Sequence, residues 1–313
     1  MPLPDGDADM PPPLTHLLLG GGGFSGLEYF GVLQGLQLWG LDAQLRCVCG
    51  ISMGAYMGAL FAAGVPMADA AALFAAFVRA PQNVSVRVAD LLGLSRTLGL
   101  YDPSPFLEVV KTALQRVWPG VDAERLTLAE FERRAGRAFR VVVTDLVQGA
   151  TELLGGDTHP TLPLLLALRA AVAVPCFIRP VEWQGRVWVD GGVTCTQPEW
   201  ALPAAPPATT LLLRLQPGEG PCTGAASSLP ALVLALVRAV ACGRGARDAS
   251  PFPHTLTVRD PVAAFMPLRW TKRGARLDVL PQTVWAAYHH GLELLLASGM
   301  LPAKPRHVPS ERL

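Results

Sequence analysis

The chain has 313 residues, half of them hydrophobic, and a formal net charge of +1 at pH 7. This length and apolar fraction allow a large buried core and exclude general disorder. A charge balance so close to zero gives no support to nucleic-acid binding, so we expect no nucleic-acid partner.

The two ends of the chain differ in composition from the rest. Residues 1–13 carry prolines and acids where a secretory signal needs basic and then apolar residues. No stretch reaches the roughly 20 uninterrupted apolar residues of a membrane span. We therefore expect a disordered lead over residues 1–13, one domain over 14–301 and a flexible tail over 302–313. The expected protein is cytoplasmic, without a signal peptide or transmembrane span.

Short apolar runs alternate with amphipathic segments along most of the chain. The expected strands cover residues 16–19, 45–50, 138–146, 209–215 and 254–258, with two more around a tight turn at Gln184-Gly185. The expected helices cover residues 25–38, 52–64, 67–80, 104–117, 162–172, 229–241 and 283–299, and a further short helix begins at residue 127. Ser104 before Pro105, and Thr127 three residues before Glu130, predict helix starts. This alternation predicts an α/β fold with a mainly parallel sheet between two layers of helices.

A candidate nucleophile lies between the second strand and the second helix. Gly50-Ile51-Ser52-Met53-Gly54 is a G-x-S-x-G sequence in the strand-to-helix context that a nucleophile elbow requires. The glycines remove side chains that would clash in the sharp turn. Ser52 then stands at a helix N-terminus, where the helix dipole favours developing negative charge. The pattern predicts a reactive serine hydroxyl.

A serine needs a base, and two candidates follow it in the chain. His254, in "PFPHTLTV", has the chain order of a Ser–His triad hydrolase. Asp190, in "VWVDGGV", follows a predicted strand and would project from the carboxyl edge of the sheet, where open α/β sheets bind ligands. An Asp-Gly pair is also common in turns. From the residues alone, both candidates remain open.

The four glycines from Gly20 to Gly23 have two interpretations. Gly21-x-Gly23-x-x-Gly26 formally matches a dinucleotide fingerprint, which also needs an acid at the end of the second strand. Here that strand runs directly into the Ser52 turn, so the nucleotide interpretation is disfavoured. The other interpretation is an oxyanion hole, in which amides of Gly22 and Gly23 stabilise the oxygen formed when Ser52 attacks an ester.

Taken in order, "GGGFSG", "GISMG" and "DGG" resemble the signature of the patatin-like phospholipase family. The resemblance covers residues 15–198 through segments such as "YDPSPFLEVV" and "VVVTDLVQGATELL". It implies a three-layer α/β/α sandwich and a lipid acyl hydrolase that uses a Ser–Asp dyad and an acyl-enzyme, without a metal or organic cofactor. By resemblance, Ser52 is the nucleophile, Asp190 the dyad aspartate, and Gly21, Gly22 and Gly23 the oxyanion loop. The remaining motif glycines are Gly26, Gly50, Gly54, Gly191 and Gly192.

The resemblance also implies partners. The expected substrate is a phospholipid or another glycerolipid, and contact with a membrane or lipid droplet is expected. "RWTKRGAR", residues 269–276, places four basic residues beside Trp270. This segment is a candidate for contact with anionic lipid, or alternatively a solvated loop.

The chain departs from the family pattern at a few positions. Ser25 stands where the family usually has Lys or Arg, which removes a cation beside the glycine loop. This change favours an alternative function, a catalytically weakened fold that binds a lipid or a partner. Thr196-Gln197-Pro198 replaces the family's Asn-x-Pro. Asp145 matches a family position and is interpreted as a structural residue that holds a turn.

Overall fold

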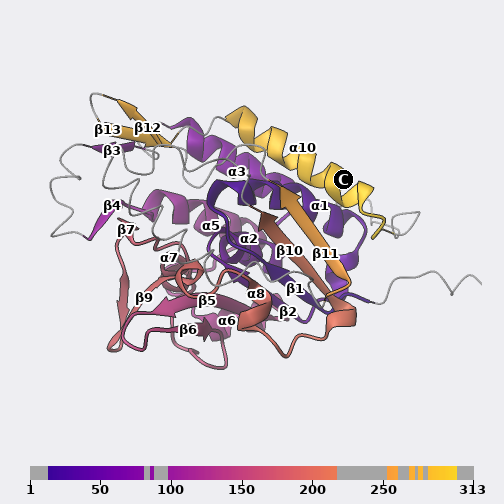
Figure 1. Ribbon diagram of the computed structural model, residues 1–313, viewed down its shortest axis with the longest axis horizontal. Helices are drawn as coiled ribbons and strands as arrows, with labels where there is room; N and C mark the ends of the chain where they lie inside the picture. The colour runs from indigo at the N-terminus through magenta and orange to yellow at the C-terminus, as the bar shows by residue number, and fades with distance from the viewer. Residues whose placement is uncertain are drawn as a thin grey trace, which may run out of the picture.

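A computed structural model of the chain describes residues 13–80, 85–87, 98–216, 252–259, 268–271, 274–277 and 281–301. Its centre is a mixed sheet with the strand order β11-β10-β1-β2-β5-β9-β8, and β6 also pairs with β5 (Figure 1). These strands are β1 His16–Leu19, β2 Cys47–Ile51, β5 Ala138–Asp145, β6 Ala150–Leu154, β8 Val181–Trp183, β9 Arg186–Asp190, β10 Thr210–Gln216 and β11 His254–Arg259. The expected lead, tail and helix over 229–241 lie outside the described residues, except for residue 13 of the lead.

The main sheet is parallel in one half and antiparallel in the other. Strands β1, β2, β5, β10 and β11 pair in parallel, whereas β6 and β9 run antiparallel to β5, and β8 is antiparallel to β9. The α/β fold class with mostly parallel strands is therefore confirmed. Smaller sheets join β12 Leu268–Thr271, β13 Gly274–Leu277 and β3 Ser85–Arg87, and also β4 Gly99–Tyr101 and β7 Cys176–Ile178.

Hydrophobic side chains cover both faces of the sheet. On β1, Leu17 and Leu19 belong to one buried cluster, and Leu18 between them belongs to another, as the two-residue period of a strand requires. The larger cluster includes side chains of α1 Tyr29–Leu38, α2 Met53–Ala62, α3 Met67–Arg79, α5 Ser104–Val117 and α7 Leu164–Ala171. The smaller cluster packs against Ala201 of α8 Pro198–Ala201.

The last described helix returns to the start of the domain. Helix α10, Pro281–Ala297, packs against α1 and α3 along the upper side of Figure 1. Its Gly291 lies so close to α1 that a Cβ there would be 2.0 Å from the carbonyl oxygen of Glu28. In the part of the chain that the structure describes, no helix has the length and apolar character needed to cross a membrane.

Strand β5 organises the part of the sheet that matters for the site. Its residues 138–142 pair with β2, and its residues 141–145 pair with β6. Its residues 143–145 pair with β9 as well. Because Val141 and Val142 have both β2 and β6 as neighbours, those two strands lie on opposite sides of β5. The same reasoning places β9 opposite β6, so β2 and β9 lie on the same side of β5 and meet end to end.

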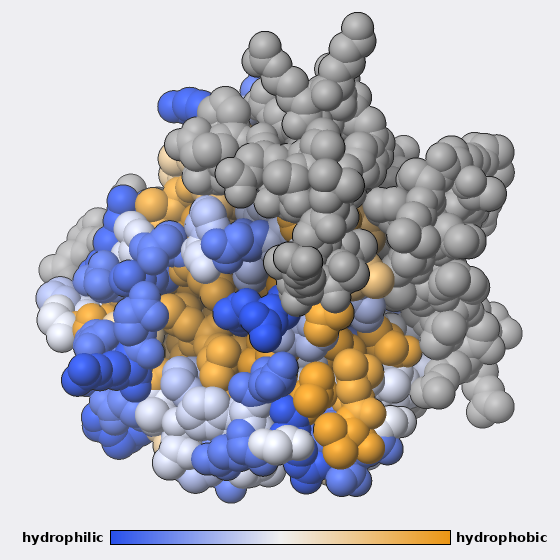
Figure 2. Space-filling view, turned by 90° about the vertical axis from the view of Figure 1, so that its left-hand side faces the viewer, coloured by the Kyte–Doolittle hydropathy of each residue, from blue (hydrophilic) through white to orange (hydrophobic). Residues whose placement is uncertain are grey.

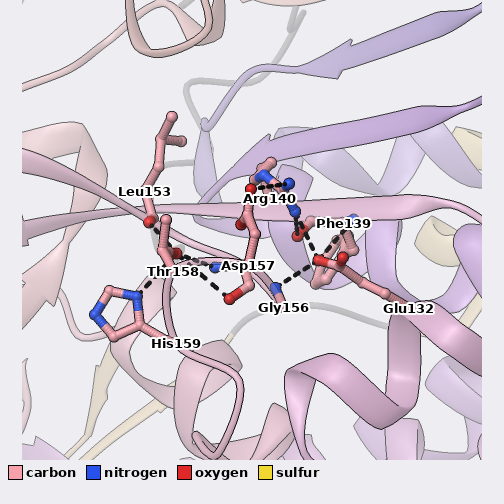
Figure 3. A network of polar contacts seen from close by, with 9 residues as sticks. Glu132, Phe139, Arg140, Leu153, Gly156, Asp157, Thr158 and His159 are labelled. Atoms are coloured by element: carbon pink, nitrogen blue, oxygen red, sulfur yellow. Dashed lines mark hydrogen bonds and ion pairs between the residues drawn. The ribbon is translucent and has the colours of Figure 1, made fainter.

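A charged network holds the amino half of β5 in place (Figure 3). Glu132 lies on α6 Leu128–Ala135 and accepts hydrogen bonds from the Phe139 and Gly156 amides at 3.2 and 2.7 Å. Arg140 donates to Glu132 at 2.6 Å and to Asp157 at 2.8 Å. Arg140 and Glu132 are largely buried, so their charges compensate each other out of water. The network ties β5 to α6 and to the loop after β6.

Several local expectations are confirmed and others need correction. The Thr127 hydroxyl accepts from the Glu130 amide at 3.3 Å, so Thr127 caps α6 as expected, whereas the Glu130 carboxylate accepts from Arg133 and Arg134. The expected helix over 25–38 instead begins with the 3-10 helix η1, Gly23–Glu28, before α1. Ser104 is the first residue of α5 and not its N-cap, and its amide and hydroxyl both donate to the Asp102 carboxylate, at 2.9 and 2.7 Å. Strand β6 was not expected.

Candidate active site

The β5 register brings Ser52 and Asp190 together although they are 138 positions apart. Ile51, the last residue of β2, pairs with Val142, and Asp190, the last residue of β9, pairs with the next residue, Val143. Ser52 follows Ile51 directly. The Ser52 hydroxyl donates a hydrogen bond of 2.6 Å to the Asp190 carboxylate oxygen Oδ2. The head-on meeting of β2 and β9 therefore positions both groups.

The backbone at Ser52 has a strained conformation. Ser52 has φ 52° and ψ −123°, a region that side-chain-bearing residues rarely occupy. Close packing of the flanking glycines holds this turn, since a Cβ at Gly50 would lie 2.4 Å from the Ala55 amide nitrogen. A Cβ at Gly54 would lie 2.4 Å from the Leu19 carbonyl oxygen. The strand–serine–helix turn expected of a G-x-S-x-G elbow is present, and Ser52 is partly exposed at the N-cap of α2.

Asp190 is buried and has no cation beside it among the described residues. Its side chain is 5% exposed, and burial raises its pKa to about 6, although the hydrogen bonds from Ser52 and from the Gly192 amide lower it. The Gly192 amide donates to Oδ1 at 2.8 Å. Gly191 lies against β5, where a Cβ would be 2.4 Å from the Val142 carbonyl oxygen. Of the two glycines in "DGG", Gly191 thus allows the backbone to pass close to β5, and Gly192 donates a hydrogen bond to the carboxylate.

The glycine loop lies against the elbow. A Cβ at Gly21 would be 3.1 Å from Cβ of Ser52, and a Cβ at Gly26 would be 2.4 Å from Cγ of Met53. The Gly20 amide donates to the Leu213 carbonyl at 2.9 Å. Among the described residues, the amides of Gly21 and Gly22 donate to no backbone carbonyl. Gly23, with φ 58°, opens η1. The side chain of Ser25 lies outside what the structure describes.

The histidine alternative is not brought to Ser52. His254 is the first residue of β11 and pairs with Leu211 of β10. Leu211 pairs with Leu17 of β1, and Leu17 pairs with Val48 of β2. Ser52 is four residues further along and three strands away, so the two residues are separated by about 20 Å at ordinary strand spacings. The triad interpretation with His254 is therefore wrong for this fold.

Other titratable groups near the site have partners of their own. Asp145 accepts from the Val147 amide at 2.8 Å and from the Gln148 amide at 3.3 Å, and it forms an ion pair with Arg186. It holds the β5–β6 turn, as expected. Across the described ranges, no group of three or more His, Cys, Asp or Glu side chains is arranged to hold a metal ion.

The sequence did not identify the residues that hold the backbone of Asp190. Thr144 on β5 donates to the Asp190 carbonyl oxygen at 3.0 Å, and Thr194 lies next to Thr144. Arg186, which pairs with Asp145, was also missed. No local pattern marks these residues, because their partners are distant in sequence. Knowledge of the β5–β9 register would have identified Thr144.

The chain thus has an α/β fold in which a serine elbow faces a buried aspartate. Comparison with known proteins identifies the family. The family model described as patatin-like phospholipase matches residues 17–202. The chain belongs to the patatin-like phospholipase family. The resemblance drawn from the motifs is confirmed.

Known relatives agree with this assignment. Uncharacterized NTE family proteins of Mycobacterium tuberculosis and Mycobacterium bovis are 30% identical over 185 residues, 58% of this chain and 43% of theirs. The match thus spans less than half the length of these curated relatives. The crystal structure of VipD from Legionella pneumophila has a TM-score of 0.51 at 16% identity and covers 91% of this chain and 67% of that one. This likeness concerns the fold.

Proposed function

We propose that the protein is a lipid acyl hydrolase in which Ser52 is the nucleophile and Asp190 the base. The observation that carries the proposal is the 2.6 Å hydrogen bond from the Ser52 hydroxyl to the Asp190 carboxylate. The strained backbone of Ser52 at the start of α2 is typical of a nucleophile elbow. Family membership supports a lipid ester as the substrate.

The chemistry follows from these two groups. The Ser52 hydroxyl passes its proton to Asp190 as its oxygen attacks the ester carbonyl carbon. The tetrahedral intermediate expels the alcohol, which takes that proton, and leaves an acyl-enzyme on Ser52. A water molecule then gives a proton to Asp190 and attacks the acyl carbon. The second tetrahedral intermediate breaks the bond to Ser52, whose oxygen takes that proton back from Asp190, and the fatty acid is released. A base with a pKa of about 6 accepts a proton more readily than an ordinary aspartate.

We assign stabilisation of the oxyanion to the glycine loop. Gly21 lies against Ser52, and the amides of Gly21 and Gly22 are not used by backbone carbonyls of the described chain. The first amides of α2 have no partner within the helix and lie beside Ser52. Loss of one oxyanion donor costs roughly 3–4 kcal/mol of barrier in other hydrolases. The loop therefore has the properties that the proposal needs.

We also propose that the substrate is a glycerolipid and that the protein contacts a lipid surface. Leu146 and Val147, at the turn between β5 and β6, are 50% and 60% exposed. The turn lies at the carboxyl end of β5, the same edge of the sheet at which Ser52 follows β2. Figure 2 shows the side of the molecule at the left of Figure 1, where hydrophobic patches lie among hydrophilic side chains. Exposed apolar side chains near a lipid-cleaving site support such contact.

A panel of lipids tests the proposed function. Wild-type protein and Ser52→Ala are incubated with phospholipids and neutral glycerides, and the released fatty acids are identified. We expect release by wild type and none above background by Ser52→Ala. Binding to lipid vesicles without fatty acid release from any class would instead favour the alternative of a non-catalytic, lipid-binding fold.

The lipid contact has its own test. Leu146→Ser with Val147→Ser removes the two apolar groups, and Leu296→Ser on α10 is a control with similar exposure, 49%. In the Ser52→Ala background, we expect the double variant to bind phosphatidylcholine vesicles at least about tenfold more weakly, because each buried apolar side chain contributes 1.5–3 kcal/mol. Equal weakening by Leu296→Ser would contradict the assignment to this turn.

A further inference from the structure

A short chain of hydroxyl groups reaches Asp190 from the protein surface. Thr144 on β5 is 2% exposed, and its hydroxyl donates to the Asp190 carbonyl oxygen at 3.0 Å. Its oxygen is 2.9 Å from the hydroxyl of Thr194, at the end of η4 Gly191–Val193. The hydroxyl of Thr194 is in turn 2.8 Å from that of Thr151 on β6, which is exposed. The chain thus links β6, η4, β5 and the end of β9.

The hydrogen bonds of this chain have one consistent direction. Each threonine hydroxyl has a single proton. Because Thr144 gives its proton to Asp190, it accepts from Thr194. Thr194 therefore accepts from Thr151. Each of the three hydroxyls therefore donates toward the interior, and the last one donates to the backbone carbonyl of Asp190.

The three threonine hydroxyls lie on the face of the sheet opposite to the Asp190 carboxylate and hold Asp190 from that face. Asp190 pairs with Val143, so their side chains lie on the same face, and Thr144 is on the other face. The Asp190 amide donates to the Ala173 carbonyl at 3.0 Å. The Asp190 peptide groups are thereby held through both the amide and the carbonyl, by residues from different elements.

The hydrogen bond from Thr144 lies where the pairing of β9 with β5 ends. Asp190 is the last paired residue of β9, and the chain then turns into η4. The Asp190 carbonyl oxygen accepts the Thr144 hydroxyl at this point. Rotation of the backbone there would move Cβ of Asp190, and with it the carboxylate that accepts from Ser52. A misplacement of about 1 Å in a catalytic geometry can cost about a hundredfold in rate.

We propose that Thr144 is a positioning residue for Asp190, and this inference rests on the proposed function of the Ser52–Asp190 pair. The Thr144 hydroxyl fixes the backbone so that the carboxylate meets the serine. Thr144 has no hydrogen bond to Ser52, and its hydroxyl contacts the Asp190 carbonyl oxygen at 3.0 Å and, less closely, that of Gly191 at 3.5 Å. Its effect on the serine therefore passes through the backbone that carries Asp190. The outer member, Thr151, is too far along the chain of hydroxyls to have the same effect.

The test compares Thr144→Val, which keeps the shape and removes the hydroxyl, with Thr144→Ser and with Thr151→Val as a matched control. For hydrolysis of a water-soluble ester, we expect Thr144→Val to lower kcat about 10- to 100-fold while KM changes less than about twofold. Thr144→Ser recovers most of the rate, and Thr151→Val stays within about twofold of wild type. If Thr144→Val does not fold, Thr194→Val removes the donor to Thr144 and is expected to lower kcat by a smaller factor.

A second readout separates positioning from a purely structural role. The hydrogen bonds from Ser52 and Gly192 lower the pKa of Asp190, so their weakening in Thr144→Val moves the acid limb of the rate profile above pH 6. A variant with a lower melting temperature but unchanged kcat and acid limb would overturn the proposal, as would equal losses in Thr151→Val.

The same variants remain informative if the proposed function fails. If wild type shows no hydrolysis that depends on Ser52, the titration of the Asp190 carboxyl is followed by ¹³C NMR, with Asp190→Asn to assign the resonance. We expect a higher pKa in Thr144→Val than in wild type. An unchanged pKa would overturn the positioning role on its own.

Discussion

Two buried aspartates at the ends of neighbouring strands have opposite properties. Asp145 ends β5 and Asp190 ends β9, and they are 1% and 5% exposed. Burial alone would raise the pKa of Asp145, but Arg186 and the amides of Val147 and Gln148 outweigh it and lower that pKa. For Asp190, burial dominates and raises the pKa to about 6.

The two carboxyl groups differ in depth as well as in partners. Both are nearly inaccessible to water, but Asp145 lies close to the surface, beside the partly exposed Arg186, whereas Asp190 lies deep in the protein. Asp145 has a guanidinium and two amides, which stabilise its charge and hold a turn. Asp190 has one amide and the Ser52 hydroxyl, a group that can give up a proton. A carboxylate that is buried without a cation is a stronger base, at some cost in stability. The comparison therefore separates a structural aspartate from a candidate base on the same sheet.

The largest expected effect is the loss of catalysis in Asp190→Asn, compared with the small loss expected in Asp145→Asn. Asp190→Asn removes the proton acceptor and is expected to lower kcat/KM for a soluble ester by at least about 10³-fold. For folded Asp145→Asn, kcat/KM is expected to stay within about tenfold of the wild-type value. Steady-state kinetics on both variants measure this contrast. Similar losses in the two variants would remove the distinction between them.

The same two substitutions are expected to change stability in opposite directions. Asp145→Asn leaves Arg186 without its partner and costs about 1–3 kcal/mol of unfolding free energy at pH 8. Asp190→Asn removes a charge that folding disfavours, and since the pKa rises by about two units, it can gain up to about 3 kcal/mol. Urea unfolding measures both values. A loss of stability in Asp190→Asn would show that the ionised carboxylate is better stabilised than its pKa indicates.

The two aspartates also give opposite pH dependence of stability. The folded pKa of Asp190, about 6, is above its unfolded value, so its stabilising contribution is complete below about pH 4 and is lost as pH rises through 6. The folded pKa of Asp145 is lowered, so its contribution is present above about pH 4 and is lost as pH falls further. The unfolding free energies of wild type and the two variants, measured from about pH 2 to pH 8, separate these contributions. A difference between wild type and Asp190→Asn that does not change with pH would contradict the raised pKa.

The smallest expected effect is that of His254→Ala. In the proposed mechanism the proton acceptor is Asp190, and His254 lies on β11, at the edge of the sheet and three strands from β2. We therefore expect kcat/KM within about twofold of wild type in ester kinetics. A loss of several orders of magnitude, with the fold intact by circular dichroism, would restore the histidine triad.

Local sequence signals predicted the parts of the site that are local in the chain. The elbow around Ser52 could be predicted because its glycines and serine are consecutive between an apolar strand and an apolar helix. The local pattern of Asp190 and its two glycines also fits an ordinary turn, so Asp190 could be chosen over His254 only through the resemblance to the family. The meeting of Ser52 and Asp190 depends on which residues of β5 pair with β2 and β9, and no local pattern encodes that register.

The same limit explains what was missed. Strand β6 was not expected, since "ATELL" has no clear alternation and its pairing with β5 depends on the turn held by Asp145. Thr144 looks like one more residue of a β-branched strand. Its role depends on Asp190, 46 positions away. The order of helices and strands was largely predicted because hydrophobic periodicity is strong over each segment.

The most direct test of the central claim is the pH dependence of fluorophosphonate labelling at Ser52, located by mass spectrometry. We predict that wild-type protein is labelled at Ser52, with a rate that rises through about pH 6 as Asp190 ionises. Asp190→Asn should be labelled at least about 10³-fold more slowly at pH 8, with Asp145→Asn as the folded control. Equal labelling of wild type and Asp190→Asn, or a modified residue other than Ser52, would contradict the account.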